Sequence, residues 1–398
     1  MSDERTQPFE SFNALYKILS WTGYFQLMKK PKNRWKWIGH GIYRLLSFLI
    51  SIFYNVEHLL FIVQKINNLD DVFDSLMIEI PQLNLIVKHL TLNLQTSRIA
   101  EINKVINDPI FEAKNKKDEE HLIKNNTDMH QLSKIMNICV CMCGLIWPAS
   151  HFVRRYQDQN AVVPVYAPFS TDTWGGYSIT VALEVVPLLW IGYGHLTLDC
   201  LISAYYAQTV VQLKIIKNNL QCLFDMDVDT RHMRSRYKDM SDPDLKRRLV
   251  YFIQRFDKLA WYTKEINKVF APAVSFQFLT SSLTICMIVN RLSCTPIFSV
   301  PFIFMFVVLL IISNQVFLYC YFGSLIHYES QSVVYSVYLS DWLSVSPYFR
   351  RMLLVAMVRW SRTLEPTVAG VIPLSLISFF TILKFAYSLY AILGTRHS

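Results

Sequence analysis

The sequence has little charge for its length. Only 17% of its 398 residues are Asp, Glu, Lys or Arg, while 52% are hydrophobic. A soluble domain carries about a quarter charged residues, so this composition indicates a membrane protein. The basic residues that give a net charge of +9 lie between apolar segments rather than along one face. The sequence therefore indicates no nucleic-acid partner.

Catalytic and metal-binding motifs are also missing. The sequence has no phosphate-binding glycine loop, no HExxH motif and no nucleophile elbow, so we expect neither an enzyme nor a bound cofactor. Residues 225–229 resemble the start of a calcium loop, but Thr230 stands where that loop needs Gly and Arg236 where it needs Glu,. The eight cysteines are scattered singly, as core residues are, and form no disulfide framework or metal site.

What the sequence does have is apolar segments of membrane length. A helix needs about 20 apolar residues to cross the hydrocarbon core. Residues 72–94 contain several charges, so this segment must face other helices or a cavity. With it, seven spans are predicted, at about residues 42–63, 72–94, 132–153, 178–211, 270–292, 298–326 and 368–393. We therefore predict an all-α membrane protein with seven transmembrane helices.

Two shorter segments complete the predicted fold. Residues 11–30 have apolar positions at helical spacing but also charges, which predicts an amphipathic helix at the membrane interface,. Residues 350–362 form a short basic helix before the last span, so the seventh helix is split. The predicted division is a cytoplasmic N-terminus at 1–40, a six-helix bundle at 41–326, an anchor segment at 327–366, and a last helix with its tail at 367–398.

The loop charges predict the orientation of the spans. With the N-terminus inside, the inside loops hold most of the Lys and Arg, while Lys65, Arg154, Arg155, Arg291 and Arg396 lie outside. Cytoplasmic loops are enriched in these residues. Seven spans then place the C-terminus outside the cell, which is the inverse of a G-protein-coupled receptor.

The C-terminal quarter resembles a known family. Residues 317–342 carry Tyr319-Cys320, Gly323, Glu329-Ser330, and Tyr338 before Trp342. This pattern is similar to the sixth span and following loop of insect odorant receptors. Residues 350–393, with Leu383-Lys384 and Ala386-Tyr387-Ser388, resemble the final helices of that family.

The resemblance implies an odorant-specific subunit of a ligand-gated, non-selective cation channel in a heterotetramer with a shared co-receptor. It also implies a location in the plasma membrane of sensory neuron dendrites, in contact with membrane lipid. The last span would line the pore, and a small volatile odorant would bind in the outer half of the bundle. Two alternatives stay open, a metabotropic seven-helix receptor and a homomeric channel like the gustatory receptors. A transporter is disfavoured because no internal repeat is visible.

Candidate residues follow from these roles. An odorant pocket needs an apolar cavity with a few polar groups. In the outer halves of the spans the candidates are Leu76, Met77, Ile80, Asn84, Cys143, Gly144, Trp147, Thr180, Val181, Glu184, Leu188, Phe302 and Met305. Pro148 predicts a kink that makes room beside Trp147. Pore candidates on one face of the last helix are Tyr387, Ala391, Gly394 and Thr395.

One ionisable pair lies deeper in the fourth span. His195 and Asp199 are four residues apart and so share a helix face,. Ionisable residues inside a membrane are expensive and usually functional. Two interpretations remain, a proton-sensitive floor of the pocket or a pair that stabilises the span.

Overall fold

The computed structural model describes residues 10–25, 34–67, 69–158, 161–224 and 243–394. Helices dominate this part of the chain, with one two-stranded hairpin near its end. The elements are α1 (Glu10–Trp21), α2 (Arg34–Gln64), α3 (Leu69–Leu94), α4 (Thr96–Ile106), η1 (Pro109–Phe111), α5 (Lys116–Gln157), α6 (Trp174–Gln221), α7 (Pro243–Ser293), α8 (Val300–Tyr338), η3 (Trp342–Ser344), α9 (Pro347–Trp360), β1 (Thr367–Val368), β2 (Ile372–Pro373) and α10 (Leu376–Gly394).

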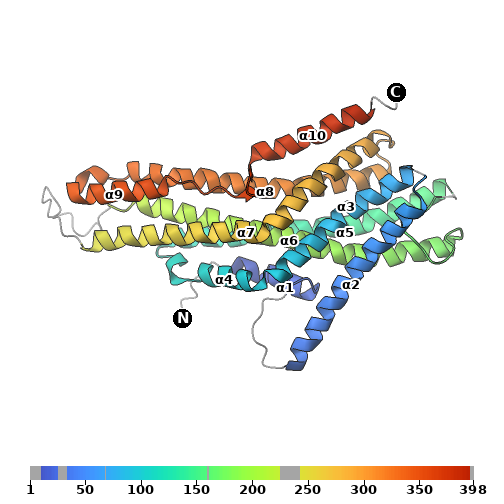
Figure 1. The fold of residues 1–398 in the computed structure, drawn as a ribbon, viewed down its shortest axis with the longest axis horizontal. Coiled ribbons are helices and arrows are strands. Elements are labelled where there is room, and N and C mark those ends of the chain that lie inside the picture. Colours follow the sequence, from blue (N-terminus) through green and yellow to red (C-terminus); the bar gives the residue numbers. More distant parts are fainter. Residues whose placement is uncertain (1–9, 26–33, 68, 159–160, 225–242, 395–398) are drawn as a thin grey trace.

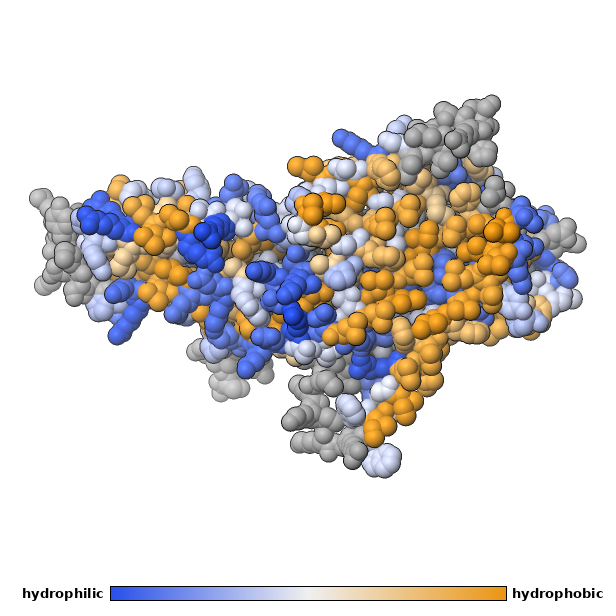
Figure 2. All heavy atoms as spheres, in the orientation of Figure 1, coloured by the Kyte–Doolittle hydropathy of each residue, from blue (hydrophilic) through white to orange (hydrophobic). Residues whose placement is uncertain are grey.

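The long helices α5, α6, α7 and α8 run side by side along the molecule (Figure 1). The longest two, α6 and α7, have 48 and 51 residues. At 1.5 Å per residue each is roughly 75 Å long, against about 30 Å for the hydrocarbon core of a bilayer. The predicted spans are therefore only parts of these helices, since charged sequence continues each of them past the membrane. Figure 2 shows the apolar surface concentrated at one end and mixed polar surface at the end that carries α9.

Five helices of the described chain are long and apolar enough to cross a membrane, namely α2, α5, α6, α7 and α8. The charged α3 and the shorter α10 complete the predicted seven. Residues 26–33 and the segment at 225–229 that resembles the start of a calcium loop lie outside the described residues.

The centre of the bundle is α6. Every residue from Gly194 to Leu213 is buried, because α5, α8, α7 and α1 all pack against this helix. A helix with apolar residues on all sides is expected at such a central position. Several of its polar residues have hydrogen-bond partners on neighbouring helices. For example, Gln208 accepts a hydrogen bond from Asn125 of α5 at 3.2 Å.

The first helix is amphipathic as expected, but its apolar face packs against protein. Phe12, Leu15 and Leu19 are at most 1% exposed, and α1 contacts α6 and α5. The Tyr16 hydroxyl lies 2.5 Å from that of Tyr205 on α6. The helix ends at Trp21, shortly before Gly23, whose φ of +77° is readily adopted only without a side chain,.

The last span begins later than predicted. Residues 367–373 form a hairpin, with β1 antiparallel to β2 and Val368 paired with Ile372, and α10 begins at Leu376. The hairpin turns at Ala369 and Gly370, which both have positive φ. Hydropathy alone merged this turn with the helix, because its residues are also apolar. The predicted split of the seventh helix into α9 and α10 is nevertheless present (Figure 1).

The hairpin is fastened to α8 through a glycine. A Cβ added to Gly323 would lie 2.2 Å from the Leu374 carbonyl oxygen and 2.5 Å from the Leu374 Cβ. Beside it, the Ser324 hydroxyl accepts a hydrogen bond from the Leu376 amide at 2.9 Å. Gly323 is therefore required for the close approach of α8 to the segment that starts α10.

Candidate functional site

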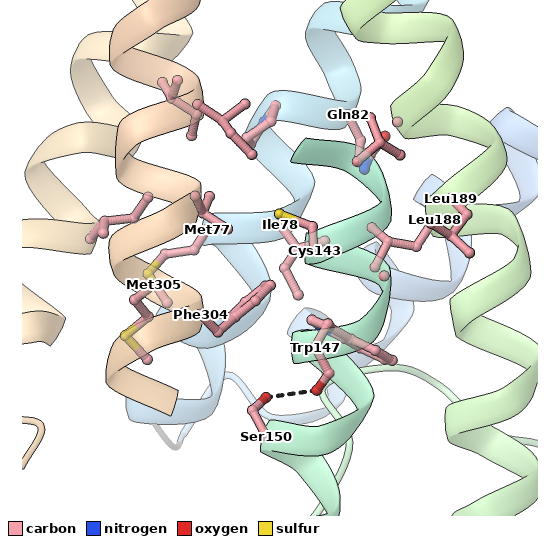
Figure 3. A pocket seen from close by; sticks show the side chains of 18 of the residues that line it. Met77, Ile78, Gln82, Cys143, Trp147, Ser150, Leu188, Leu189, Phe304 and Met305 are labelled. Carbon is pink, nitrogen blue, oxygen red and sulfur yellow. Dashed lines mark hydrogen bonds between the residues drawn. The ribbon is translucent and has the colours of Figure 1, made fainter. Parts of the chain in front are cut away.

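A cavity of about 220 Å³ lies among α3, α5, α6 and α8. Figure 3 shows Phe304 and Met305 of α8 across from Leu188 and Leu189 of α6, with Trp147 of α5 between them. Its lining residues are Met77, Ile78, Pro81, Gln82, Val140, Cys143, Gly144, Trp147, Ser150, His151, Arg154, Pro164, Leu188, Leu189, Gly192, His195, Leu196, Ile288, Pro301, Phe304, Met305, Val308, Ile311, Ile312 and Gln315.

The loop between α5 and α6 covers the end of the cavity beside Trp147. Val163 and Val165 are buried against Trp147, Tyr177 and Val181. Arg155, at the end of α5, holds this loop by donating hydrogen bonds to the carbonyl oxygens of residues 161 and 172. The loop therefore forms a roof whose inner surface is apolar.

The wall between α5 and α6 is tight. A Cβ on Gly144 would lie 2.2 Å from Leu189 Cδ2, so the absence of a side chain at Gly144 allows α5 and α6 to pack closely beside the cavity. The helix α5 continues through Pro148, which has no N–H to donate to the carbonyl of Gly144. Trp147, the residue before Pro148, is only 1% exposed and lines the cavity.

A buried polar network forms the floor. Asp199 accepts hydrogen bonds from Lys88 of α3 and from Gln315 and Tyr319 of α8, the Gln315 bond being 2.8 Å long. The Lys88 Nζ also lies 2.8 Å from His195 Nε2. Lys88 and Asp199 are both at most 2% exposed. Each charge is expensive to bury alone, so each residue of the pair, with its added hydrogen bonds, offsets the cost of burying the other.

The network continues into α7. Asn84 donates to Gln277, and lies 3.3 Å from His195 Nε2. The Gln277 amide in turn donates to Ser281 at 2.6 Å and to Gln315 at 3.3 Å. Polar side chains from α3, α6, α7 and α8 thus form one layer beneath the cavity.

Both interpretations of His195 and Asp199 find support in this geometry. His195 lines the cavity, while Asp199 lies one turn deeper and is surrounded by donors. Sequence reasoning missed Lys88 as their partner. The signal was available, because Lys88 is a cation inside an apolar span and Asp199 is a buried anion that needs one.

The predicted ligand-binding residues fall into three groups. Cavity-lining ones are Met77, Cys143, Gly144, Trp147, Leu188 and Met305. The second group lies near this cavity without lining it. Asn84 belongs to the floor and Val181 to the roof, while Thr180 and Glu184 line a second cavity. The remainder, Leu76, Ile80 and Phe302, do not line either cavity.

On α8 the sequence indicated the segment that lines the cavity, but only one of its two candidate residues lies on the lining face. Phe304, Met305, Val308, Ile312 and Gln315 line the cavity, a spacing of one helical stripe. Phe302 points elsewhere and stacks on Phe306, with ring centroids 6.5 Å apart. Hydropathy does not predict which face of a helix points inward when the helix is apolar on every side.

The pore candidates can be placed only in part. Tyr387 lies on α10 and is 66% exposed. The side chains of Ala391 and Gly394, although within the bounds of α10, and the whole of Thr395 lie outside the described residues. Ala386, the residue before Tyr387, is buried against α7 and α8 residues, so one face of α10 packs on the bundle and another faces away from it.

Comparisons with known proteins agree with this architecture. The family model described as 7tm odorant receptor matches residues 68–387. The chain is 22% identical to a putative odorant receptor 92a of Drosophila melanogaster over 52% of its own length and 47% of the relative's. It is 29% identical to odorant receptor 82a of the same organism over 59% and 58%. The chain thus matches about half the length of these relatives.

A solved structure has the same fold. The olfactory receptor OR5 of Machilis hrabei, determined in complex with eugenol, matches with a TM-score of 0.82 at 14% identity, over 96% of this chain and 97% of that one. The structure of OR5 alone matches with a TM-score of 0.80. This similarity confirms the predicted all-helical, seven-span membrane fold.

Proposed function

The chain belongs to the 7tm odorant receptor family, and from this premise we propose that it is the odorant-specific subunit of an odorant-gated, non-selective cation channel. It works in a heterotetramer with the shared co-receptor, in the plasma membrane of a sensory neuron dendrite. This proposal also covers the orientation, with the N-terminus inside, which the loop charges favour.

The cavity below Trp147 is the observation that carries the proposal. Its lining is largely apolar, with a few polar groups such as Gln82, His195 and Gln315 at set positions, which is the usual character of a small-molecule site. Its volume of about 220 Å³ is below the roughly 300–1,000 Å³ of pockets for drug-sized ligands. A small volatile molecule fits this size and polarity.

A single apolar cluster connects the cavity with the last helix. Met305 and Ile312 line the cavity, and they belong to the same packed cluster as Leu383 and Ala386 of α10. A ligand that fills the cavity displaces these α8 side chains or holds them in one arrangement. We assign this cluster the role of transmitting occupancy to α10, the proposed pore wall with Tyr387, Ala391, Gly394 and Thr395.

The opposite end of the molecule suits assembly. On α9, Val355 and Val358 are 73% and 68% exposed, although this end carries the polar surface in Figure 2. Exposed apolar residues within polar surroundings mark interaction surfaces. We propose that residues 327–366 form the anchor between subunits, that 41–326 hold the ligand pocket and that 367–398 contribute to the pore.

Co-expression with the insect co-receptor tests the function. Currents are recorded while a panel of small volatiles is applied, with and without inhibition of G-protein signalling. We expect a rapid inward cation current that does not need a G protein. Efficient surface expression with no current for any volatile, or a current abolished by G-protein inhibition, contradicts the channel and favours a metabotropic receptor.

The assembly surface has its own test. Val358→Glu places a charge on the exposed α9 surface and is expected to reduce co-purification with the co-receptor. The matched control is Ile123→Glu, because Ile123 is also exposed, at 48%, and lies on the charged start of α5, outside the predicted spans and outside residues 327–366. Equal co-purification of the Val358→Glu and unmodified chains excludes α9 as the anchor surface.

A further inference from the structure

A second cavity lies between α2, α6 and the loop that follows α5. Its volume is about 440 Å³, and it is separate in its lining residues from the cavity below Trp147. The α2 residues on its rim, Leu46, Leu49, Ile50 and Phe53, are between 47% and 62% exposed. Because they lie within a membrane-spanning helix, the cavity opens toward the lipid bilayer.

The polar groups of this cavity are mainly hydrogen-bond acceptors. The carboxylates of Glu57 on α2 and Glu184 on α6 both line it. Glu184 is 5% exposed, and its Oε2 makes no hydrogen bond with any described residue; the nearest cation-forming group is His58, at 3.6 Å. The Tyr54 hydroxyl is also buried, lines the cavity and interacts with the Glu184 carboxylate.

A third carboxylate increases the excess of hydrogen-bond acceptors over donors near this cavity. Glu79 of α3 is 1% exposed, neither of its oxygens has a hydrogen-bond partner among the described residues, and it interacts electrostatically with Tyr54, as Glu57 and Glu184 do. Among the described residues, the His58 imidazole is the basic group that approaches Glu184, at 3.6 Å. An excess of buried acceptors inside a membrane is costly unless a proton donor or cation satisfies it.

The backbone adds one more acceptor. Pro187 of α6 has no N–H, so the Leu183 carbonyl lacks its usual helical partner,. Both residues line the same cavity. A ligand with hydrogen-bond donors can therefore bind this carbonyl oxygen as well as the carboxylates.

Aromatic rings complete the lining. Phe53 and Tyr54 of α2 and Tyr166 and Phe169 of the loop all contribute to the cavity wall. Ring faces attract organic cations, and carboxylates bind ammonium groups through charge-assisted hydrogen bonds. The two features together select for a positive charge on an apolar body.

We propose that this second cavity is a binding site for an amphiphilic organic ammonium ion. The protonated amine binds the Glu184 and Glu57 carboxylates, and the hydrocarbon part lies between the aromatic rings and the exposed side of α2. The proposal is independent of the proposed channel function, because it concerns a different cavity and requires no current.

Such an ammonium group has two sources, a free alkylamine or the head group of a membrane lipid. Glu184 lies ten residues from the start of α6 at Trp174, which is roughly 15 Å along the helix. That depth favours a free amine, since a lipid head group remains near the surface of the bilayer.

Ligand-dependent thermal stability tests the site on the full-length protein in neutral maltoside micelles. The probes are octylamine, octan-1-ol and octanoate at equal concentrations, and a ligand that binds the folded state raises the melting temperature. We expect octylamine to stabilise the protein, and the alcohol and the acid to have much smaller effects. Equal stabilisation by all three probes overturns the proposal.

Two isosteric variants assign the effect to the cavity. Glu184→Gln and, on the more exposed side, Glu57→Gln are each expected to weaken octylamine binding about tenfold or more, as loss of one partner of a buried charge pair does. Met305→Trp, which fills the other cavity, is expected to keep octylamine binding. Unchanged binding in both Gln variants, or loss only in Met305→Trp, overturns the assignment.

A final arm separates the two sources. Phosphatidylethanolamine is added to the micelles before octylamine is titrated. Competition identifies the lipid head group as an occupant of the site, and its absence identifies a free amine. Both results are consistent with an ammonium-binding site. Whether the site binds an ammonium group at all is decided by the comparison of octylamine, octan-1-ol and octanoate.

Discussion

Lys88 of α3 donates a hydrogen bond to Asp199 of α6 at the level where the main cavity ends. Neither residue has access to water beyond 2% of its side chain. The pair therefore joins two helices that are far apart in sequence, at the end of the main cavity.

Breaking this pair should strongly destabilise the protein. Lys88→Met leaves the Asp199 carboxylate without its cation, and Asp199→Asn leaves Lys88 as an uncompensated buried charge. Each single change is expected to cost about 3–5 kcal/mol, measured as loss of unfolding free energy in detergent. The double variant should cost less than the sum of the two, and strictly additive costs would show that the two residues are not coupled.

Gly323→Ala should disturb the start of α10. The new methyl group meets the Leu374 carbonyl at 2.2 Å, so the hairpin must move, at an expected cost of about 1–3 kcal/mol. We expect a lower melting temperature and a reduced odorant current. Gly41→Ala is the matched control, because nothing lies within 4 Å of the added atom. Equal behaviour of the two variants would refute the close contact.

Filling the main cavity should strongly reduce the sensitivity to a small odorant while sparing the fold. Met305→Trp adds volume at a residue that lines the cavity. Met142→Trp makes the same change on α5 at a side chain that is 46% exposed and lines neither cavity. Concentration–response curves should show at least a tenfold loss of sensitivity for the first variant only. A normal response of Met305→Trp would place the odorant elsewhere.

One ion pair outside the membrane predicts a pH dependence. A hydrogen bond from Lys258 lowers the pKa of the Asp108 carboxyl below its ordinary 3.8, helped by the Ile110 amide. A lowered carboxyl pKa stabilises the folded state at all pH values above the ordinary pKa, and this contribution is lost as the pH falls through the lowered value.

Asp108→Asn measures that contribution. Both partners are partly exposed, so we expect a loss of only about 0.5 kcal/mol. The difference in unfolding free energy between the variant and the unmodified chain should be constant from pH 8 to about pH 5 and should shrink below pH 4. A difference that changes between pH 8 and pH 6 would point to another titrating group.

The positions of the spans were predictable because apolar length is a local property. What hydropathy could not give was the rotation and depth of each helix. Met305 and Phe302 looked alike in the sequence, yet only Met305 lines the cavity. Both lie on a helix that is apolar all round, where the neighbours rather than the pattern decide which face points inward.

The contacts between distant segments were equally hidden. The ionisable residues Lys88, His195 and Asp199 were each visible, but their meeting depends on how α3 crosses α6. Thr180 and Glu184 were assigned to the same pocket as Trp147, and the loop at 161–169 divides them from it by filling the space between. Loop conformation is not encoded in periodicity.

The uninterrupted course of α6 and α8 from the cavity level to the far end of the molecule has a consequence for engineering. If the proposed roles hold, the change from ligand-binding to assembly surface lies within these helices, near Asp199 and Tyr319, and not at a loop. A chimaera with a related receptor should therefore be joined in mid-helix at that layer, with the polar residues of the layer all taken from one parent. Junctions placed in loops would transplant a pocket together with the wrong subunit contacts.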